Sequence, residues 1–391
     1  MSQNFVLGRT RLSFQIKTIV ANLMDITATI TGITYQPLLA RKLKEYDIDT
    51  FDVNHCPKSC LIIDDNQLFS LSNWISPKRT RSYPYEGIYD TLTGNKKITV
   101  IPVVKDEGLA GDRDFIQWDT ISLMSLLDVY VILAYYDRAQ INVHFTDKIT
   151  AQCFDNQYII QKISELQNYH SSALHWNLKE TKENLASLLN KATVCYTKMS
   201  EILGVKMHSE IGIHSLQERI HSDLENFMRF SREKSEKAQF RESRTQQPKE
   251  SLSTLTKGMI TITNYLGGKY FFTVDEVFIE NDKLYLTESK HSNKSFLPSK
   301  SDIKDGLLKM VLYSNLQTVS VSDVLYRAIP VLRLTSPRIS HPIDSYATVE
   351  QLKFFISTHG MSKNQAEFIT QLFAEAQKNQ FKIVIEHGVS G

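Results

Sequence analysis

The sequence predicts a mixed α/β (α+β) protein with several structural regions. Short apolar runs alternate with turn signals over residues 33–145, and apolar positions recur every three or four residues over 185–202. A strand hairpin followed by an amphipathic helix is expected over residues 273–315. The chain has 391 residues, 42% hydrophobic and 23% charged, which excludes collagen-like, disulfide-scaffold and wholly disordered proteins.

Four regions follow from these patterns and from the length, which suits two or three domains. We expect an N-terminal α/β region over residues 1–155 and a helical connector with a basic end over 156–245. A core with the hairpin is expected over 246–330, and an extension of helices and a strand over 331–391.

The N-terminal region contains the most apolar window of the chain, residues 121–136. It is too short to cross a bilayer and carries Asp128, so we expect a buried core segment and no transmembrane helix. The first residues lack the features of a secretory signal. Residues 60–63 and 97–104 are expected to be strands, the second at a sheet edge because Pro102 cannot donate to a ladder.

The four cysteines give little support to a metal centre. Cys56 and Cys60 lie beside His55, which leaves a partial zinc site open, but Cys153 and Cys195 stand apart and complete no four-ligand set. We favour reduced, structural cysteines in a cytoplasmic protein.

The connector is expected to be helical because apolar positions form two stripes: Leu185, Leu188, Leu189, Ala192, Cys195, Met199 and Ile202, then Leu216, Ile220, Leu224 and Phe227. The second helix ends in a basic run that includes Arg241, Arg244 and Lys249. With 45 basic against 43 acidic residues overall, only such local clusters can favour a polyanionic partner. The alternative interpretation is that the basic run is a solvent-exposed helix face that binds no polyanion.

Near the C-terminus, residues 348–357 and 362–378 are expected to be helices separated by Gly360, followed by a strand at 381–385. A DNA-reading helix-turn-helix is one interpretation of this pair, and a hairpin that only packs is the commoner one.

The hairpin contains the residues that suggest chemistry. With Asn281-Asp282 as its two-residue loop, Asp275 lies opposite Glu288, and Lys290 lies on the same face. Val277, Ile279, Leu284 and Leu286 would continue that face as an apolar floor, whereas Glu276 would point to the opposite face beside Thr287. Two carboxylates near an apolar layer repel each other, and a divalent cation such as Mg²⁺ would relieve the repulsion. Surface charges on an ordinary hairpin are the alternative.

A helix is expected from Asp302 to about Asn315, capped by Ser301. One apolar face comprises Ile303, Leu307, Leu308, Val311 and Leu312, and we expect Lys304 and Lys309 to lie away from it.

Asp275 followed by Glu288-Ser289-Lys290 on the next strand resembles the PD-(D/E)xK nuclease superfamily. Residues 288–292 together with 301–310 are similar to bacterial type II restriction endonucleases, and segments 76–85 and 111–118 are similar to the same group. The one departure is Val274, where a proline often stands.

The resemblance implies a restriction-endonuclease-like core, in which helices flank a mixed central sheet. It implies a Mg²⁺ site formed by Asp275, Glu288 and the main-chain carbonyl of Ser289, with Lys290 as the catalytic lysine. Mn²⁺ would substitute, and Ca²⁺ would support binding only. Glu250 is a candidate additional acid.

The implied activity is site-specific hydrolysis of double-stranded DNA by a cytoplasmic bacterial homodimer, alongside a companion DNA methyltransferase for the same site. The N-terminal region is a candidate for DNA recognition: Arg79, Arg81 and Arg113 have donor geometry suited to phosphate or guanine, and Gln117 could pair with adenine. A repair or defence nuclease and a non-catalytic DNA-binding protein remain alternatives. A P-loop, a serine-nucleophile elbow and a His-Glu-x-x-His helix are all lacking from the sequence.

Overall fold

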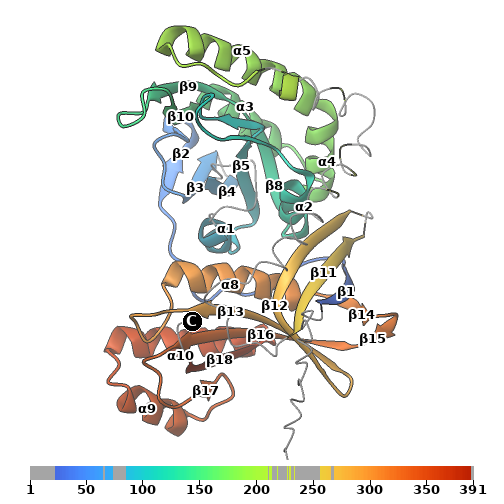
Figure 1. Cartoon of the computed structure of the whole chain (residues 1–391), viewed down its shortest axis with the longest axis vertical. Helices are drawn as coiled ribbons and strands as arrows, with labels where there is room; N and C mark the ends of the chain where they lie inside the picture. The colour runs from blue at the N-terminus through green and yellow to red at the C-terminus, as the bar shows by residue number, and fades with distance from the viewer. Residues whose placement is uncertain are drawn as a thin grey trace, which may run out of the picture.

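The computed structural model describes residues 23–64, 67–73, 85–209, 211–213, 256–265 and 268–388, with the isolated positions 218, 227, 229 and 233. Over these residues the fold is mixed α/β with several sheets. A unit around a five-stranded sheet lies above a unit around a nine-stranded sheet, and helix α8 (Lys300–Tyr313) lies at the junction (Figure 1).

The nine-stranded sheet has the order β15-β14-β1-β11-β12-β13-β16-β18-β17. Its strands are β1 (Leu23–Ile30), β11 (Thr256–Asn264), β12 (Lys269–Glu280), β13 (Lys283–His291), β14 (Gln317–Val321), β15 (Val324–Leu325), β16 (Arg327–Ser336), β17 (Ile343–Asp344) and β18 (Lys382–His387). The pairs β1–β11, β13–β16 and β16–β18 are parallel, and the other pairs are antiparallel.

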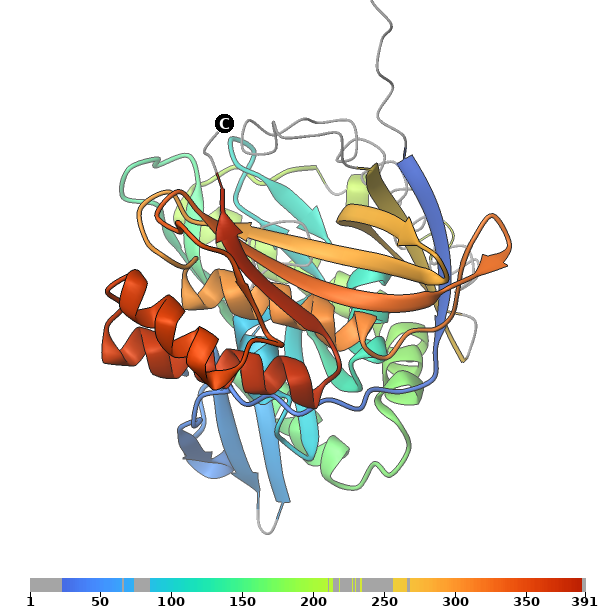
Figure 2. The same ribbon diagram turned by 90° about the horizontal axis from the view of Figure 1, so that it is seen from below.

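Helices α8, α9 (Val349–Thr358) and α10 (Lys363–Lys378) accompany this sheet, and in the view from below the strands lie in front of α8 (Figure 2). The expected C-terminal helices are confirmed, and each begins with a capping box, at Thr348 and at Ser362. Buried Phe368, Ile369 and Leu372 show that α10 packs by an apolar face.

The five-stranded sheet has the order β2-β3-β4-β5-β8. Its strands are β2 (Glu45–Asp47), β3 (Ser59–Asp64), β4 (Gln67–Asn73), β5 (Lys96–Pro102) and β8 (Val129–Ala134), and a 3-10 turn, η1 (Ile48–Thr50), follows β2. Two-stranded sheets are formed by β6 (Val104–Asp106) with β7 (Arg113–Phe115) and by β9 (Tyr136–Ile141) with β10 (Ile149–Phe154).

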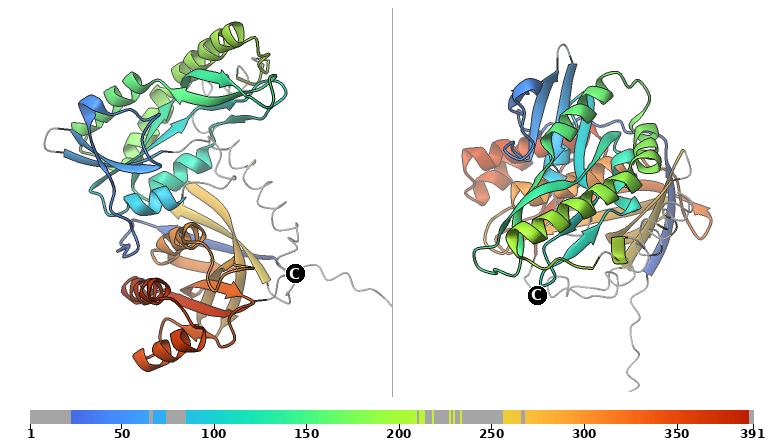
Figure 3. Two further views of the ribbon diagram at one scale, coloured as in Figure 1. Left: turned by 90° about the vertical axis from the view of Figure 1, so that its left-hand side faces the viewer. Right: turned by 90° about the horizontal axis from the view of Figure 1, so that it is seen from above.

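Helices of the same unit cover this sheet (Figure 3). They are α1 (Tyr85–Thr91), α2 (Trp118–Leu126), α3 (Asn156–Gln167), α4 (Ala173–Glu183) and α5 (Leu185–Leu203). The window at 121–136 is a core segment as expected, formed by α2 and β8. None of the helices within the described ranges is both long and apolar enough to span a membrane.

The first stripe of the connector is confirmed for Leu185, Leu188, Leu189, Ala192 and Met199, which are buried along α5. Ile202 was assigned to it wrongly, because this side chain near the helix end is 81% exposed. Most of the second stripe, and the basic run with Arg241, Arg244 and Lys249, lie outside the described residues.

Two expectations from local patterns differ from the topology. The strand at 97–104 is not at an edge, because β5 pairs with β4 and with β8; Pro102 is its last residue, where a missing donor costs little. The boundary we placed at residue 330 also falls inside one sheet, because β16, β18 and β17 continue from β13, and β1 from the N-terminal region pairs with β11.

Candidate active site

The hairpin of β12 and β13 has the register that its two-residue turn predicts. Val277 pairs with Leu286, Ile279 with Leu284, and Glu276 with Thr287. Asn281 adopts a φ of 55°, which asparagine tolerates better than most residues. Val277, Leu284 and Leu286 are buried on one face, but Ile279 is 38% exposed, so the apolar floor ends before the hairpin tip.

The two strands separate where the acidic residues begin. The β12–β13 ladder ends at the pair Glu276–Thr287, beyond which β12 continues alongside β11 (Figure 1). At this fork the half-buried Asp275 accepts a hydrogen bond through Oδ2 from the main-chain N–H of Ser289, at 2.9 Å. This hydrogen bond to the main chain of β13 orients the Asp275 carboxylate toward Glu288.

Glu288 is 2% exposed and lies between two lysines. Its Oε1 is 3.0 Å from Lys290 Nζ, and its Oε2 is 2.6 Å from Lys309 Nζ on α8. Lys290 also forms an ion pair with Asp305, one helical turn before Lys309. Asp305 and Lys309 thus bridge α8 to the two charged residues of β13.

A glycine makes room for this contact between helix and strand. A Cβ atom at Gly306 would lie 2.6 Å from Leu332 Cδ1 and 3.4 Å from Lys290 Cε. The missing side chain therefore lets the Lys290 stem run across α8 toward Asp305.

The charges of the site shift each other's protonation. Burial, and then the neighbouring Glu288, raise the pKa of Asp275 from 3.8 to about 7. Burial would also raise the pKa of Glu288, but Lys309 and Lys290 outweigh it and hold that pKa below its usual value. The pKa of Lys290 is raised by Glu288 and Asp305 despite its burial, so the lysine stays charged.

Glu276 lies on the opposite face, as expected. It forms an ion pair with Arg333 on β16, and Arg333 Nε is 3.1 Å from Glu386 on β18. This second set of charges crosses the sheet away from α8, so Asp275, and not Glu276, is the partner of Glu288.

Helix α8 corrects two expectations. Ser299, not Ser301, caps it by accepting the N–H of Asp302, at 3.1 Å. The expected apolar face is buried, but Lys304 is buried too and pairs with Asp90 of α1 at 2.6 Å. Lys304 was placed wrongly because α8 is covered on two sides, by its sheet and by α1. Lys309 is not buried with the apolar face, as expected, and contacts Glu288.

The residues that could hold a small hard cation are Asp275, Glu288 and the Ser289 carbonyl. Among the described residues no group of three or more His, Cys, Asp or Glu side chains has metal-site geometry. Two facing carboxylates still fit Mg²⁺, which is commonly bound by one or two carboxylates and keeps several waters. The raised pKa of Asp275 is consistent with a pair that a cation would relieve.

The structure describes two of the candidate DNA contacts, Arg113 and Gln117, and both belong to the five-stranded unit. The Arg113 guanidinium donates to the Ser209 carbonyl at 2.7 Å and lies over the Phe115 ring, so it has partners within its own unit. Gln117 is the N-cap residue of α2, but its side chain makes no capping bond. Three sets lie outside the described residues: Glu250; Arg79 and Arg81; Arg241, Arg244 and Lys249.

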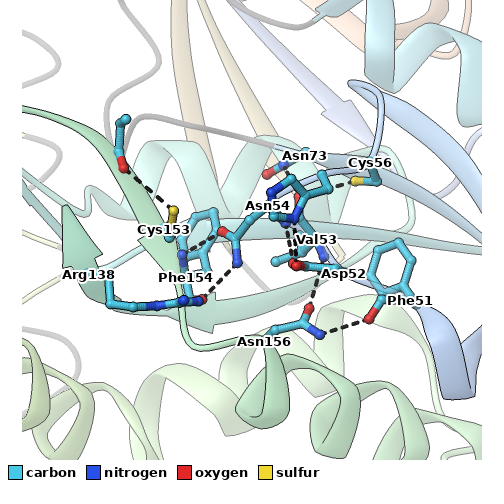
Figure 4. A network of polar contacts seen from close by, with 12 residues as sticks. Phe51, Asp52, Val53, Asn54, Cys56, Asn73, Arg138, Cys153, Phe154 and Asn156 are labelled. Carbon is cyan, nitrogen blue, oxygen red and sulfur yellow. Dashed lines mark hydrogen bonds and ion pairs between the residues drawn. The ribbon is translucent and has the colours of Figure 1, made fainter. Parts of the chain in front are cut away.

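The cysteines do not form a metal cluster within the described part of the chain, and all four are free. Cys56 Sγ donates to the Val53 carbonyl at 3.3 Å in a loop held by asparagines (Figure 4). Asn54 exchanges hydrogen bonds with the main chain of Phe154, and Asn156 accepts from Val53 N–H. The network ties this loop to β10 and to the first residue of α3.

Sequence reasoning missed Asp305 and Lys309 as members of the site. Their spacing of four residues places them on one face of a helix, which was a readable signal. That this face meets Glu288 and Lys290 depends on how α8 crosses the sheet.

No protein-family model matches the chain, and comparisons with curated proteins and with solved structures gave no significant match. The function therefore has to be argued from the geometry of this site.

Proposed function

We propose that the chain is a Mg²⁺-dependent, site-specific endonuclease of double-stranded DNA, of the type II restriction kind. One observation carries the proposal: at the fork of a hairpin, two facing carboxylates, Asp275 and Glu288, lie beside a lysine, Lys290. This combination suits metal-assisted phosphodiester hydrolysis, because the carboxylates can hold a cation and the lysine can neutralise negative charge near the attacked phosphorus.

Each residue has a distinct task in this proposal. Asp275, oriented by the Ser289 N–H, and Glu288 hold the cation, and the Ser289 carbonyl can complete the protein ligands. Bound Mg²⁺ supplies polarisation of the phosphoryl oxygen. Lys290, fixed by Glu288 and Asp305, positions the attacking water or neutralises developing charge. A homodimer would match a palindromic site.

The test is digestion of unmethylated phage DNA in Mg²⁺ by the wild-type protein, Glu288→Gln and Lys290→Ala. We expect discrete fragments from the wild type and a loss of at least about a hundredfold in either variant. EDTA should stop the reaction, and Ca²⁺ should leave DNA binding measurable.

A matched control is Glu280→Gln, because Glu280 lies at the exposed end of the same hairpin. This variant should cut like the wild type. Full activity of Glu288→Gln would contradict the proposal, and a smear in place of discrete bands would favour a repair or defence nuclease.

A non-catalytic DNA-binding protein is the second candidate, and one observation favours it. Both carboxylate oxygens of Glu288 already have lysine partners, as in a purely structural ion-pair network. DNA binding that is independent of metal, with no cleavage in Mg²⁺ or Mn²⁺, would support this candidate over the first.

A further inference from the structure

Two lysine ammonium groups contact the carboxylate of Glu288, which would bind the divalent cation. Lys309 Nζ lies 2.6 Å from Glu288 Oε2, and Lys290 Nζ lies 3.0 Å from Oε1. A cation shared by Asp275 and Glu288 would stand beside both ammonium groups, and the repulsion between these positive charges favours the departure of one lysine.

The two lysines are not equally able to leave. Lys290 is also held by Asp305, and 18% of its side chain is exposed. Within the described part of the chain, the Lys309 ammonium is ion-paired with Glu288 and attracted by Asp275, the two carboxylates that the cation would neutralise. Its side chain is 29% exposed, which gives the ammonium a path toward solvent. Lys309 is therefore the group that a cation displaces at lower cost.

The displaced ammonium would remain near the reaction. Lys309 is fixed on α8, one turn from Asp305, so its side chain can move only within reach of the same fork. A phosphate bound at the cation would give the Lys309 ammonium a negatively charged partner in place of Glu288. Ammonium groups bind phosphate well.

Resting on the proposed function, we propose that Lys309 is a positioning residue that competes with the divalent cation for Glu288 and moves to the substrate phosphate when the cation binds. Without metal it neutralises Glu288. With metal it orients the phosphodiester group that is to be cleaved.

The experiment measures Mn²⁺ binding by isothermal titration calorimetry in Lys309→Met and in the wild type. Because the competing charge is removed, we expect Mn²⁺ affinity to rise about tenfold. Lys300→Met is the matched control: Lys300 is an exposed lysine at the start of the same helix, and its variant should bind Mn²⁺ like the wild type. Lys309→Arg keeps the charge and should show no increase.

A second readout is binding of sheared phage DNA in Ca²⁺ by filter retention. We expect Lys309→Met to lose affinity although it binds the metal more tightly, and Lys300→Met to lose little. This opposite movement separates competition from a structural role, in which misfolding would lower both affinities.

Unchanged or weaker Mn²⁺ binding by Lys309→Met would overturn the inference. If the wild type still binds Mn²⁺ and cuts DNA in that case, only the inference fails. If no variant binds Mn²⁺ and the wild type does not cut, the proposed function fails with it.

Discussion

Asp275 lies in an environment that differs strongly from that of an exposed carboxyl. It is half-buried, faces Glu288 and accepts one main-chain hydrogen bond, and its pKa is raised to about 7 by burial and by that neighbour. A carboxyl near its pKa at neutral pH is costly to keep ionised and is a common feature of functional sites. The same property makes stability depend on pH.

We predict that Asp275→Asn stabilises the metal-free protein at alkaline pH. The folded protein binds this proton more tightly than the unfolded chain, whose pKa is near 3.8, so this group's contribution falls as pH rises from about 4 to about 7. Asp275→Asn lacks this loss, so its stability relative to the wild type should rise by about 4 kcal/mol between pH 4 and the alkaline side of that window.

Urea unfolding in EDTA between pH 4 and pH 8 measures the difference. The asparagine side chain keeps an oxygen that accepts from the Ser289 N–H, so the wild type and the variant both form this hydrogen bond. A difference in unfolding free energy that stays constant with pH would disprove the prediction.

Helix α8 connects the candidate site to the five-stranded unit. On one side Asp305 and Lys309 contact the charged residues of β13. On the other side Lys304 pairs with Asp90 of α1, which is fully buried and also 3.0 Å from Arg41 Nε. Neighbouring positions on one helix thus hold the site and the other unit together.

We predict that Asp90→Ala destabilises the protein by about 3–5 kcal/mol, since it leaves the buried Lys304 ammonium without its partner. The double variant Asp90→Ala with Lys304→Met should recover part of that loss because the buried ammonium is removed together with its partner, and Arg41, the other partner of Asp90, is exposed to solvent. Chemical denaturation of the three proteins tests this, and equal stability of single and double variants would refute it.

Over the whole molecule, Glu375 of α10 joins both units at one point. It is fully buried and accepts the hydroxyls of Tyr35 and Tyr89, each at 2.7 Å, and the main-chain N–H groups of Leu38 and Leu39, at 2.8 and 3.0 Å. Tyr89 belongs to α1, and residues 35–39 connect β1 to the five-stranded sheet. The buried apolar residues of the two units form one continuous cluster.

We predict that Glu375→Ala separates the unfolding of the two units and lowers stability by about 3 kcal/mol, because four donors lose their acceptor. All 3 tryptophans, at positions 74, 118 and 176, lie in the sequence of the N-terminal half. Tryptophan fluorescence and far-ultraviolet circular dichroism should therefore coincide during unfolding of the wild type and diverge for the variant. Coincident transitions in the variant would contradict the prediction.

Features that depend on residues close together in the sequence could be predicted. The hairpin register follows from a two-residue turn, and the ends of α9 and α10 follow from capping boxes at Thr348 and Ser362. The α8 cap was missed by two residues because Ser299 and Ser301 are both good caps, and only the chain path distinguishes them.

The sequence by itself determined that Asp275, Glu288 and Lys290 lie together on one face at one end of a hairpin, since alternation along paired strands is a local rule. The separation of the two strands at that end was not predictable from it, because β12 follows β11 there and β13 follows β16. Tertiary structure decided that Asp305 and Lys309 lie beside Lys290 and Glu288. It also decided that Lys304 pairs with the buried Asp90, and that β1 and β16 to β18 belong to the same sheet. These features bring together residues far apart in the chain, and the periodicity of a sequence does not predict such contacts. They form only when burying two sheets and α8 together outweighs the entropy of bringing those segments together.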